Sequence, residues 1–381
     1  MPLFIEGGRV PPRWAARKKR PSGTVESYAP GAECVRLAFI NNMPDAALED
    51  TEMQFFELLD VASGDVVVCV KLHSLAGLAR GERGEGHLNR FYFSTDDLFD
   101  HRFDGMIMTG TEPKQSNLRH EPYWSALANV LDWAENHTVS TILSCLAAHA
   151  GVLHSDGISR RPLRDKQFGV FAFTKSGNHP LTGGTGEQIC FPHSRWNEVP
   201  ADALAACGYS VLTQSAEGGV DSFVKKKKRS LFVHFQGHPE YDAHTLLKEY
   251  RRDIKRFVRG ERETYPAMPS GYFDPESARR VTEFQHLVLS DRREELMERF
   301  PEEALAGTLQ KTWYASATTI YRNWLRYVQW AGCMSATSKD DNPRRVYPGE
   351  CEAPVVTRCP KPYDPGPISS PADLEMRGRN R

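Results

Sequence analysis

Hydrophobic and polar positions along the first half of this chain alternate between two periods. Short runs of apolar, often β-branched residues predict buried strands, and stretches with apolar residues three or four positions apart predict amphipathic helices. The predicted strands are 35–40, 66–72, 105–109 and 139–143, and the predicted helices are 45–59 (with Asp45 as N-cap), 123–135 and 146–153. This alternation predicts an α/β fold: a mainly parallel sheet flanked by helices, with functional sites at the carboxyl ends of the strands.

The second half of the domain follows a different pattern. Short strands separated by glycine and charged turns predict added antiparallel strands at 170–173, 188–191, 209–212, 222–224 and 231–235. The basic run 225–229 between the last two is expected to be a solvated hairpin tip. Helices are expected at 243–258, 275–299 and 312–330, and the apolar stripe of the last predicts packing on the body or on a partner subunit.

The two ends differ in composition from the middle. Residues 1–32 place basic residues, among them Arg13, Arg17, Lys18, Lys19 and Arg20, between Pro and Gly, which predicts a basic, poorly ordered arm. Residues 336–381 are rich in Pro and charge, which predicts a disordered tail. One domain is therefore expected over 33–335, and the pattern assigns no function to either end.

Composition narrows the class of protein. The 381 residues are 40% hydrophobic and 25% charged with a net charge of −1, so no long-range attraction to nucleic acid or membrane is expected. No apolar run approaches the roughly 18 residues of a membrane span. Eight cysteines without CxxC pairs argue against a metal site and fit a reducing compartment, so a cytoplasmic protein is expected.

Cys145 lies where a predicted strand gives way to an Ala-rich helix. There a thiol faces the free N–H groups and the positive dipole end of the helix, which favour a thiolate and can bind an oxyanion. The alternative is a small buried hydrophobe, the commonest state of a free cysteine. The local sequence alone favours that alternative.

A second motif reverses this preference. In His238-Pro239-Glu240 the proline keeps the preceding residue out of the helical region, and residues two apart in an extended segment point the same way. Glu240 can then accept a proton from one nitrogen of His238, leaving the other to deprotonate a nucleophile. A surface His and Glu at a helix start is the alternative for this motif. Together with Cys145, the motif predicts a nucleophile, base and orienting carboxylate at adjoining strand ends.

These motifs resemble the class I glutamine amidotransferase superfamily and, within it, the homoserine O-succinyl- and O-acetyltransferases. The residues that carry the closer resemblance are 42–44 (NMP), 88–92 (LNRFY), 104–110 (DGMIMTG), 192–195 (PHSR), 236–242 (QGHPEYD), 249–253 (EYRRD) and 323–325 (NWL). They occur in the family's order and cover about residues 34–330.

The resemblance implies an acyltransferase of methionine biosynthesis. Cys145 would take an acyl group from succinyl-CoA or acetyl-CoA as a thioester, His238 would be the base, and Glu240 would orient it. Arg252 would bind the carboxylate of homoserine, and Lys166 and Ser194 would contact the substrate. No permanently bound cofactor or metal is implied, the partners are the small-molecule substrates, and relatives are typically homodimers.

Some positions depart from the family pattern. Leu146 and His149 stand where the family commonly has Trp and Gln, and Lys114 stands at the position associated with acyl choice. A lysine there predicts a pairing with the succinyl carboxylate, so succinyl is favoured over acetyl. Alternatives are another amino-acid acceptor, a glutaminase, or a non-catalytic member of the fold. Leu143 and Ala147 disfavour a glutaminase, whose elbow usually carries glycine at both places.

Overall fold

The computed structural model describes residues 3–19 and 34–337, where the strands form one sheet of ten. In sheet order the strands are β1 (Leu3–Ile5), β3 (Val68–His73), β2 (Val35–Ile40), β4 (Gly105–Met108), β5 (Ser140–Ser144), β10 (Ser230–Phe235), β9 (Gly219–Lys227), β8 (Ser210–Ser215), β6 (Arg161–Lys175) and β7 (Gln188–Glu198). The strands from β1 to β10 pair in parallel, and those from β10 to β7 pair antiparallel. The predicted parallel core with added antiparallel strands is confirmed.

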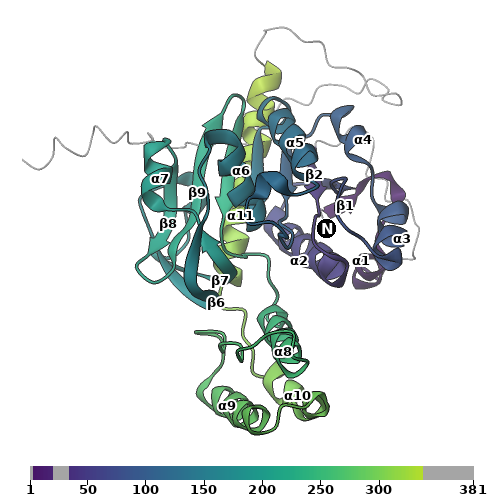
Figure 1. Cartoon of the computed structure of the whole chain (residues 1–381). Helices are drawn as coiled ribbons and strands as arrows, with labels where there is room; N and C mark the ends of the chain where they lie inside the picture. Colours follow the sequence, from purple (N-terminus) through teal and green to yellow (C-terminus); the bar gives the residue numbers. More distant parts are fainter. Residues whose placement is uncertain (1–2, 20–33, 338–381) are drawn as a thin grey trace, which may run out of the picture.

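Helices cover both faces of the parallel half (Figure 1). The α-helices are α1 (Pro12–Arg17), α2 (Asp45–Ser63), α3 (Glu82–Phe91), α4 (Thr95–Phe99), α5 (Trp124–His137), α6 (Leu146–Asp156), α7 (Ala201–Ala206), α8 (Thr245–Val258), α9 (Pro275–Ser290), α10 (Glu302–Ala306) and α11 (Tyr314–Thr337). Short 3-10 helices are η1 (Glu6–Gly8), η2 (Leu118–His120), η3 (Pro180–Thr182) and η4 (Glu294–Arg299).

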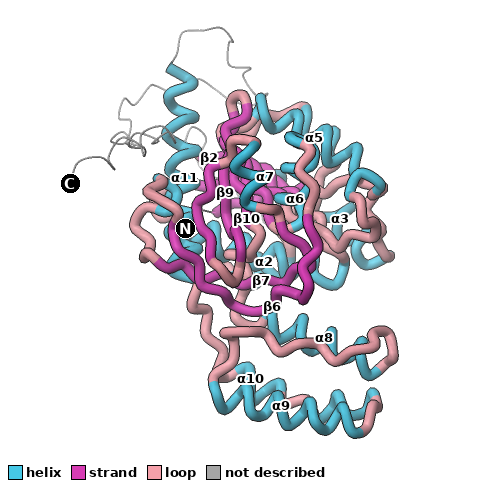
Figure 2. Tube along the Cα trace, turned by 60° about the vertical axis from the view of Figure 1, so that its left-hand side comes forward, coloured by secondary structure: helices cyan, strands magenta, loops and turns pink. Residues whose placement is uncertain are grey.

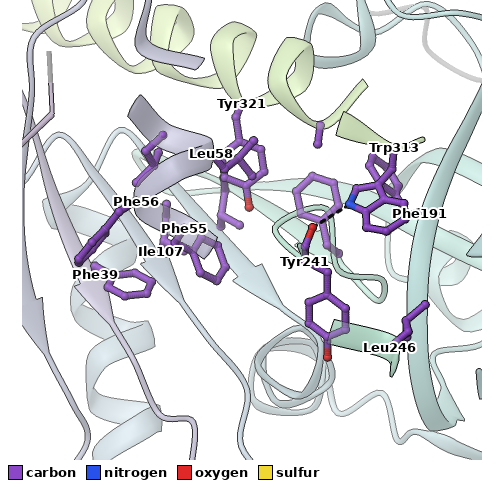
Figure 3. Packing of buried hydrophobic residues seen from close by; sticks show 14 of the residues in the cluster. Phe39, Phe55, Phe56, Leu58, Ile107, Phe191, Tyr241, Leu246, Trp313 and Tyr321 are labelled. Carbon is purple, nitrogen blue, oxygen red and sulfur yellow. Dashed lines mark hydrogen bonds between the residues drawn. The ribbon is translucent and has the colours of Figure 1, made fainter. Parts of the chain in front are cut away.

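The alternation of side chains along β2 separates two cores. Leu37 and Phe39 face a large cluster that includes residues of α2 and α11, whereas Ala38 and Ile40 face a second cluster with residues of α5 and α6. Figure 3 shows the first cluster, with Tyr321 of α11 reaching toward Leu58 of α2. The apolar stripe of α11 therefore packs on the body of the domain.

A group of helices projects from the sheet and carries part of the site. In both Figure 1 and Figure 2, α8, α9 and α10 lie together beyond the end of the body. The single helix expected over 275–299 is divided here. Asp291 has extended backbone, so α9 ends before it and the chain resumes as η4. The expectation of one continuous helix is therefore wrong.

The expected disorder of the N-terminal arm is wrong for residues 3–19. Strand β1 extends the sheet beside β3, and the indole of Trp14 is 1% exposed and packs against Phe56 with ring centroids 5.4 Å apart. The basic residues of α1 and its end bind acids of α2: Arg13 lies 2.7 Å from Asp50 and Lys18 lies 2.5 Å from Asp60. Residues 20–33 and the tail expected over 338–381 lie outside the described residues.

Two smaller expectations are also settled. Pro44, and not Asp45, holds the N-cap position of α2, and the Asp45 carboxylate instead accepts the backbone N–H of Gly81 at 2.7 Å. The expected hairpin tip over 225–229 is correct only for residues 228 and 229, because residues 225–227 are the end of β9 and pair with β10. Lys228 lies 2.9 Å from the Glu135 carboxylate. Within 3–19 and 34–337, each helix is too short or too polar to cross a membrane.

Candidate active site

Cys145 occupies a sharp turn between β5 and α6. Its φ of 54° and ψ of −115° place it in a region that side-chain-bearing residues rarely adopt, at a cost of about 1–3 kcal/mol. The turn is held because the Cys145 N–H donates to the Phe235 carbonyl at 2.8 Å. This geometry presents the partly exposed thiol at the carboxyl end of the sheet, as the sequence predicts.

The neighbouring strand, β10, leads into the loop that places His238 at the same end of the sheet. Strands β5 and β10 are parallel neighbours with Ser144 opposite Phe235, so the residues that follow each strand emerge side by side. The loop after β10 is pinned by backbone contacts: the Gln236 N–H donates to the Asp221 carbonyl and the His238 N–H to the Pro192 carbonyl, both at 2.8 Å. His238 is thereby fixed beside Cys145, although 93 positions of sequence separate them.

The side chains of these two loops form a connected set. His238 interacts electrostatically with the Cys145 side chain, and its Nδ1 donates to Glu240 Oε1 at 2.8 Å. Glu240 is 3% exposed, and Ser144 Oγ donates to the same carboxylate oxygen at 3.4 Å. Burial lowers the pKa of His238, but the charges of Cys145 and Glu240 outweigh it and hold that pKa well above its usual value. The ring is therefore favoured in its protonated form beside the sulfur.

A glycine lets a second loop approach the elbow. A Cβ on Gly110 would lie 2.8 Å from the backbone nitrogen of Leu146, closer than side chains and backbone pack. Leu146 is the first residue of α6, where backbone N–H groups lack partners within the helix. The loop after β4 and the start of α6 thus meet next to the thiol, with N–H groups available for a developing oxyanion.

The site opens into a cavity of about 830 Å³. Its lining comes from the start of α2, the loop after β4, the elbow, β7 and one face of α8. Residues of α8 contribute because positions three and four apart share one side of a helix. The lining residues of α8 are Thr245, Lys248, Glu249, Arg252, Asp253 and Arg256.

Three of the residues expected to contact substrate lie together on this wall. Lys166 Nζ lies 3.1 Å from Asp253 Oδ2, and Arg252 Nη2 lies 3.2 Å from Asp253 Oδ1. The Ser194 hydroxyl donates to the Glu249 carboxylate, whose other oxygen accepts the Tyr241 hydroxyl at 2.8 Å. Cations and carboxylates therefore alternate at the site where a zwitterionic amino acid could bind.

Lys114 is the exception among the predicted residues. Its side chain is exposed and is not part of the cavity lining, because its backbone N–H is bound to Glu121 Oε1 at 2.6 Å in a loop that turns outward. The geometry therefore does not support the expected contact between Lys114 and an acyl carboxylate.

Sequence reasoning did not assign several charged residues of the lining, among them Glu249, Asp253 and Arg160. Glu249 and Asp253 carry the polar side of α8, and Arg160 precedes β6. The charged residues at helical spacing between 245 and 256 were a usable signal for the first two. No sequence pattern indicated Arg160, because it lies in an irregular segment.

Comparison with known proteins identifies relatives along most of the chain. A family model described as homoserine O-succinyltransferase matches residues 25–332. A homoserine O-succinyltransferase of Methylorubrum extorquens is 44% identical over 77% of this chain and 87% of its own length. One of Rhodopseudomonas palustris is 42% identical over 77% of this chain and 88% of its own length.

Solved structures of similar arrangement include two glutamine amidotransferases. One from Thermotoga maritima covers 78% of this chain and 99% of its own, with 10% identity and a TM-score of 0.42. One from Methylobacillus flagellatus covers 77% of this chain and 96% of its own, with 14% identity and a TM-score of 0.44.

Proposed function

This chain belongs to the homoserine O-succinyltransferase family, and from that premise we propose that it transfers a succinyl group from succinyl-CoA to the hydroxyl of homoserine, in methionine biosynthesis. The observation that carries the proposal is the connected set Cys145, His238 and Glu240 at the floor of an open cavity. The family match independently supports the resemblance drawn from the motifs.

In the first half-reaction, Cys145 Sγ attacks the thioester carbonyl of the donor. The thiol proton is held on His238, the carbonyl oxygen becomes an oxyanion near the Leu146 N–H, and the C–S bond to CoA breaks. The leaving CoA sulfur takes the proton from His238. The product is a succinyl thioester on Cys145, with the Glu240 carboxylate stabilising the charged ring while it holds the proton.

In the second half-reaction, the homoserine hydroxyl attacks that thioester. His238 removes the hydroxyl proton, a second oxyanion forms at the same N–H groups, and the C–S bond to Cys145 breaks. The proton returns to the sulfur, and O-succinylhomoserine leaves. Because CoA departs before the acceptor reacts, the proposal requires ping-pong kinetics.

His238 is the better base of the two histidines in the cavity lining of the described residues. The other, His149, has its pKa lowered to about 3 by burial, and its Nε2 faces Gln236 Oε1 at 2.9 Å. A group of such low basicity is poorly matched to proton transfer near neutral pH. The pKa of His238 shifts in the opposite direction, and Cys145 is among the groups that raise it.

For the acceptor, we assign the homoserine carboxylate to Arg252, with Lys166 and Ser194 beside it. The planar guanidinium suits a bidentate carboxylate contact, and half of its surface is exposed toward the cavity. The carboxylates of Glu249 and Asp253 are close enough to receive the substrate's ammonium group. A cytoplasmic homodimer without a permanent cofactor completes the proposal.

The test is to incubate the purified chain with succinyl-CoA in the absence of acceptor and to map acyl adducts by mass spectrometry. We expect one adduct, on Cys145, that neutral hydroxylamine removes and that homoserine discharges as O-succinylhomoserine. Cys145→Ser should carry no hydroxylamine-sensitive adduct at that position. An unmodified Cys145 would refute the acyl-enzyme mechanism. Discharge by another amino acid instead, or release of glutamate from glutamine, would favour the other acceptor or the glutaminase.

A further inference from the structure

A succinyl donor differs from an acetyl donor by a second, ionised carboxylate, which must be accommodated near Cys145. Burying a carboxylate without a partner is costly, so a succinyl-selective site needs a cation or several N–H donors there. Lys114 does not fill this place, since its side chain is exposed and away from the lining. The position of the selecting cation is therefore open.

Arg160 has the position that such a cation needs. It is half-buried in the segment between α6 and β6, and it lines the same cavity as Cys145. Its Nη2 donates to the carbonyls of Gln115 at 3.1 Å and Ser116 at 3.2 Å, which ties the guanidinium to the loop that follows Gly110. Burial lowers the pKa of Arg160, and the smaller effects of Tyr123, Glu121 and Cys145 oppose that shift.

Arg160 also differs from the other cations of the lining in what it binds. Lys166, Lys248, Arg252, Arg256 and Arg262 each lie within 4 Å of a carboxylate, at Asp253, Asp50, Asp253, Glu112 and Asp253. Arg160 has no such ion pair within 3–19 and 34–337, and its Nε and Nη1 have no hydrogen-bond partner there.

The remaining cation of the lining is already engaged. Arg195 uses Nε on His193 at 3.2 Å, Nη1 on the Asn197 carbonyl at 2.8 Å and Nη2 on the Gly218 carbonyl at 2.7 Å. Its guanidinium is therefore committed to holding β7 and the turn before β9. Arg160 keeps the N–H groups of Nε and Nη1 available for a ligand.

We propose that Arg160 binds the free carboxylate of the succinyl group, and so selects succinyl-CoA over acetyl-CoA. This rests on the proposed acyl transfer to Cys145. Arg160 Nη2 donates to the carbonyls of residues 115 and 116, and the acyl carboxylate accepts from the remaining N–H groups of the guanidinium. The loop that carries Lys114 then orients Arg160, and Lys114 itself does not contact the donor.

The experiment compares donors in Arg160→Gln, Arg160→Lys and the parent chain. Rates of Cys145 acylation and kcat/KM are measured with succinyl-CoA and with acetyl-CoA, together with the KM for homoserine. In Arg160→Gln, kcat/KM for succinyl-CoA should fall about 10- to 100-fold, as expected for a lost charge-assisted contact, while the value for acetyl-CoA stays within about twofold. Arg160→Lys should recover part of the succinyl preference, and the KM for homoserine should not change.

Arg119→Gln is the matched control, because Arg119 is exposed, donates to the Leu153 carbonyl and is outside the cavity lining. Retained acetyl transfer shows that an Arg160 variant is folded. Equal losses with both donors would overturn the inference in favour of a structural role or a contact with CoA itself. A fall with Lys114→Gln and none with Arg160→Gln would return the role to the lysine. If neither donor acylates Cys145 in the parent chain, the proposed function itself is refuted.

Discussion

Replacing Glu240 with Gln tests the link between the buried carboxylate and the base. Glu240 is 3% exposed, and its Oε1 holds His238 Nδ1 at 2.8 Å, whereas its Oε2 has no hydrogen-bond partner among the described residues. The amide has the same shape without the charge. It therefore removes the electrostatic part of the contact and leaves the packing in place.

The expected magnitude follows from the kind of hydrogen bond that is lost. A bond to a charged group contributes about 1.5–3 kcal/mol and a neutral one about 0.5–1.5 kcal/mol, so the exchange should cost about 1 kcal/mol, or roughly fivefold in kcat/KM. The loss grows if the amide NH₂ turns toward Nδ1, because that arrangement favours the wrong tautomer of His238. Thermal stability should fall, since the protonated His238 ring loses its buried counter-charge.

The assay is the pH profile of kcat/KM, which separates this role from a merely structural one. Because Glu240 raises the pKa of His238, the apparent pKa of the Cys145–His238 pair should move to lower pH in the variant. Glu52→Gln is the control, since Glu52 is also buried and lies 2.6 Å from His87, outside the cavity lining. Its pH profile should match the parent. An unchanged rate and an unchanged profile in Glu240→Gln would refute the orienting role.

Three further predictions follow from the contacts above. Arg252→Ala should raise the KM for homoserine more than tenfold and leave the rate of Cys145 acylation within twofold; an unaltered KM would reject the assigned contact. Trp14→Ala should lower the free energy of unfolding by about 3–5 kcal/mol in denaturant titrations, because the indole is fully buried, and a loss under about 1 kcal/mol would mean that α1 is not part of the cooperative fold. Burial lowers the pKa of His234 from 6.5 to about 3, so the unfolded state binds the extra proton and stability present at neutral pH is lost as pH falls below 6.5, by about 2 kcal/mol at pH 5. His234→Leu should flatten that pH dependence by this amount whereas His120→Gln, at an exposed position, should not, and equal slopes in all three chains would contradict the assignment.

Local pattern was sufficient for the elements that build the centre of the sheet. The strand at 35–40 was predicted to the residue, because five of its six positions are apolar and buried. The elbow at Cys145 and the pairing of His238 with Glu240 also follow from short motifs, whose backbone geometry is set within a few residues. Such features are local, and sequence carries them directly.

The errors lie where distant contacts decide the outcome. The arm at residues 3–19 looks too polar to fold. In the structure Trp14 packs against Phe56, and the basic residues form ion pairs with acidic residues of α2. Only the assembled domain brings these residues together. Helix 275–299 breaks although its composition permits a helix throughout.

The sequence by itself determined the class of fold and the family, and it predicted the proposed nucleophile, base and orienting carboxylate, because each depends on short-range pattern. The tertiary structure decided which charges surround the reacting atoms. It turned Lys114 toward solvent, placed Arg160 in the cavity, and set Glu249 and Asp253 opposite Lys166 and Arg252. The physical reason is that whether a cation can bind a substrate depends on the distance and burial of the groups around it. Residues next to the cation in the sequence do not determine either quantity.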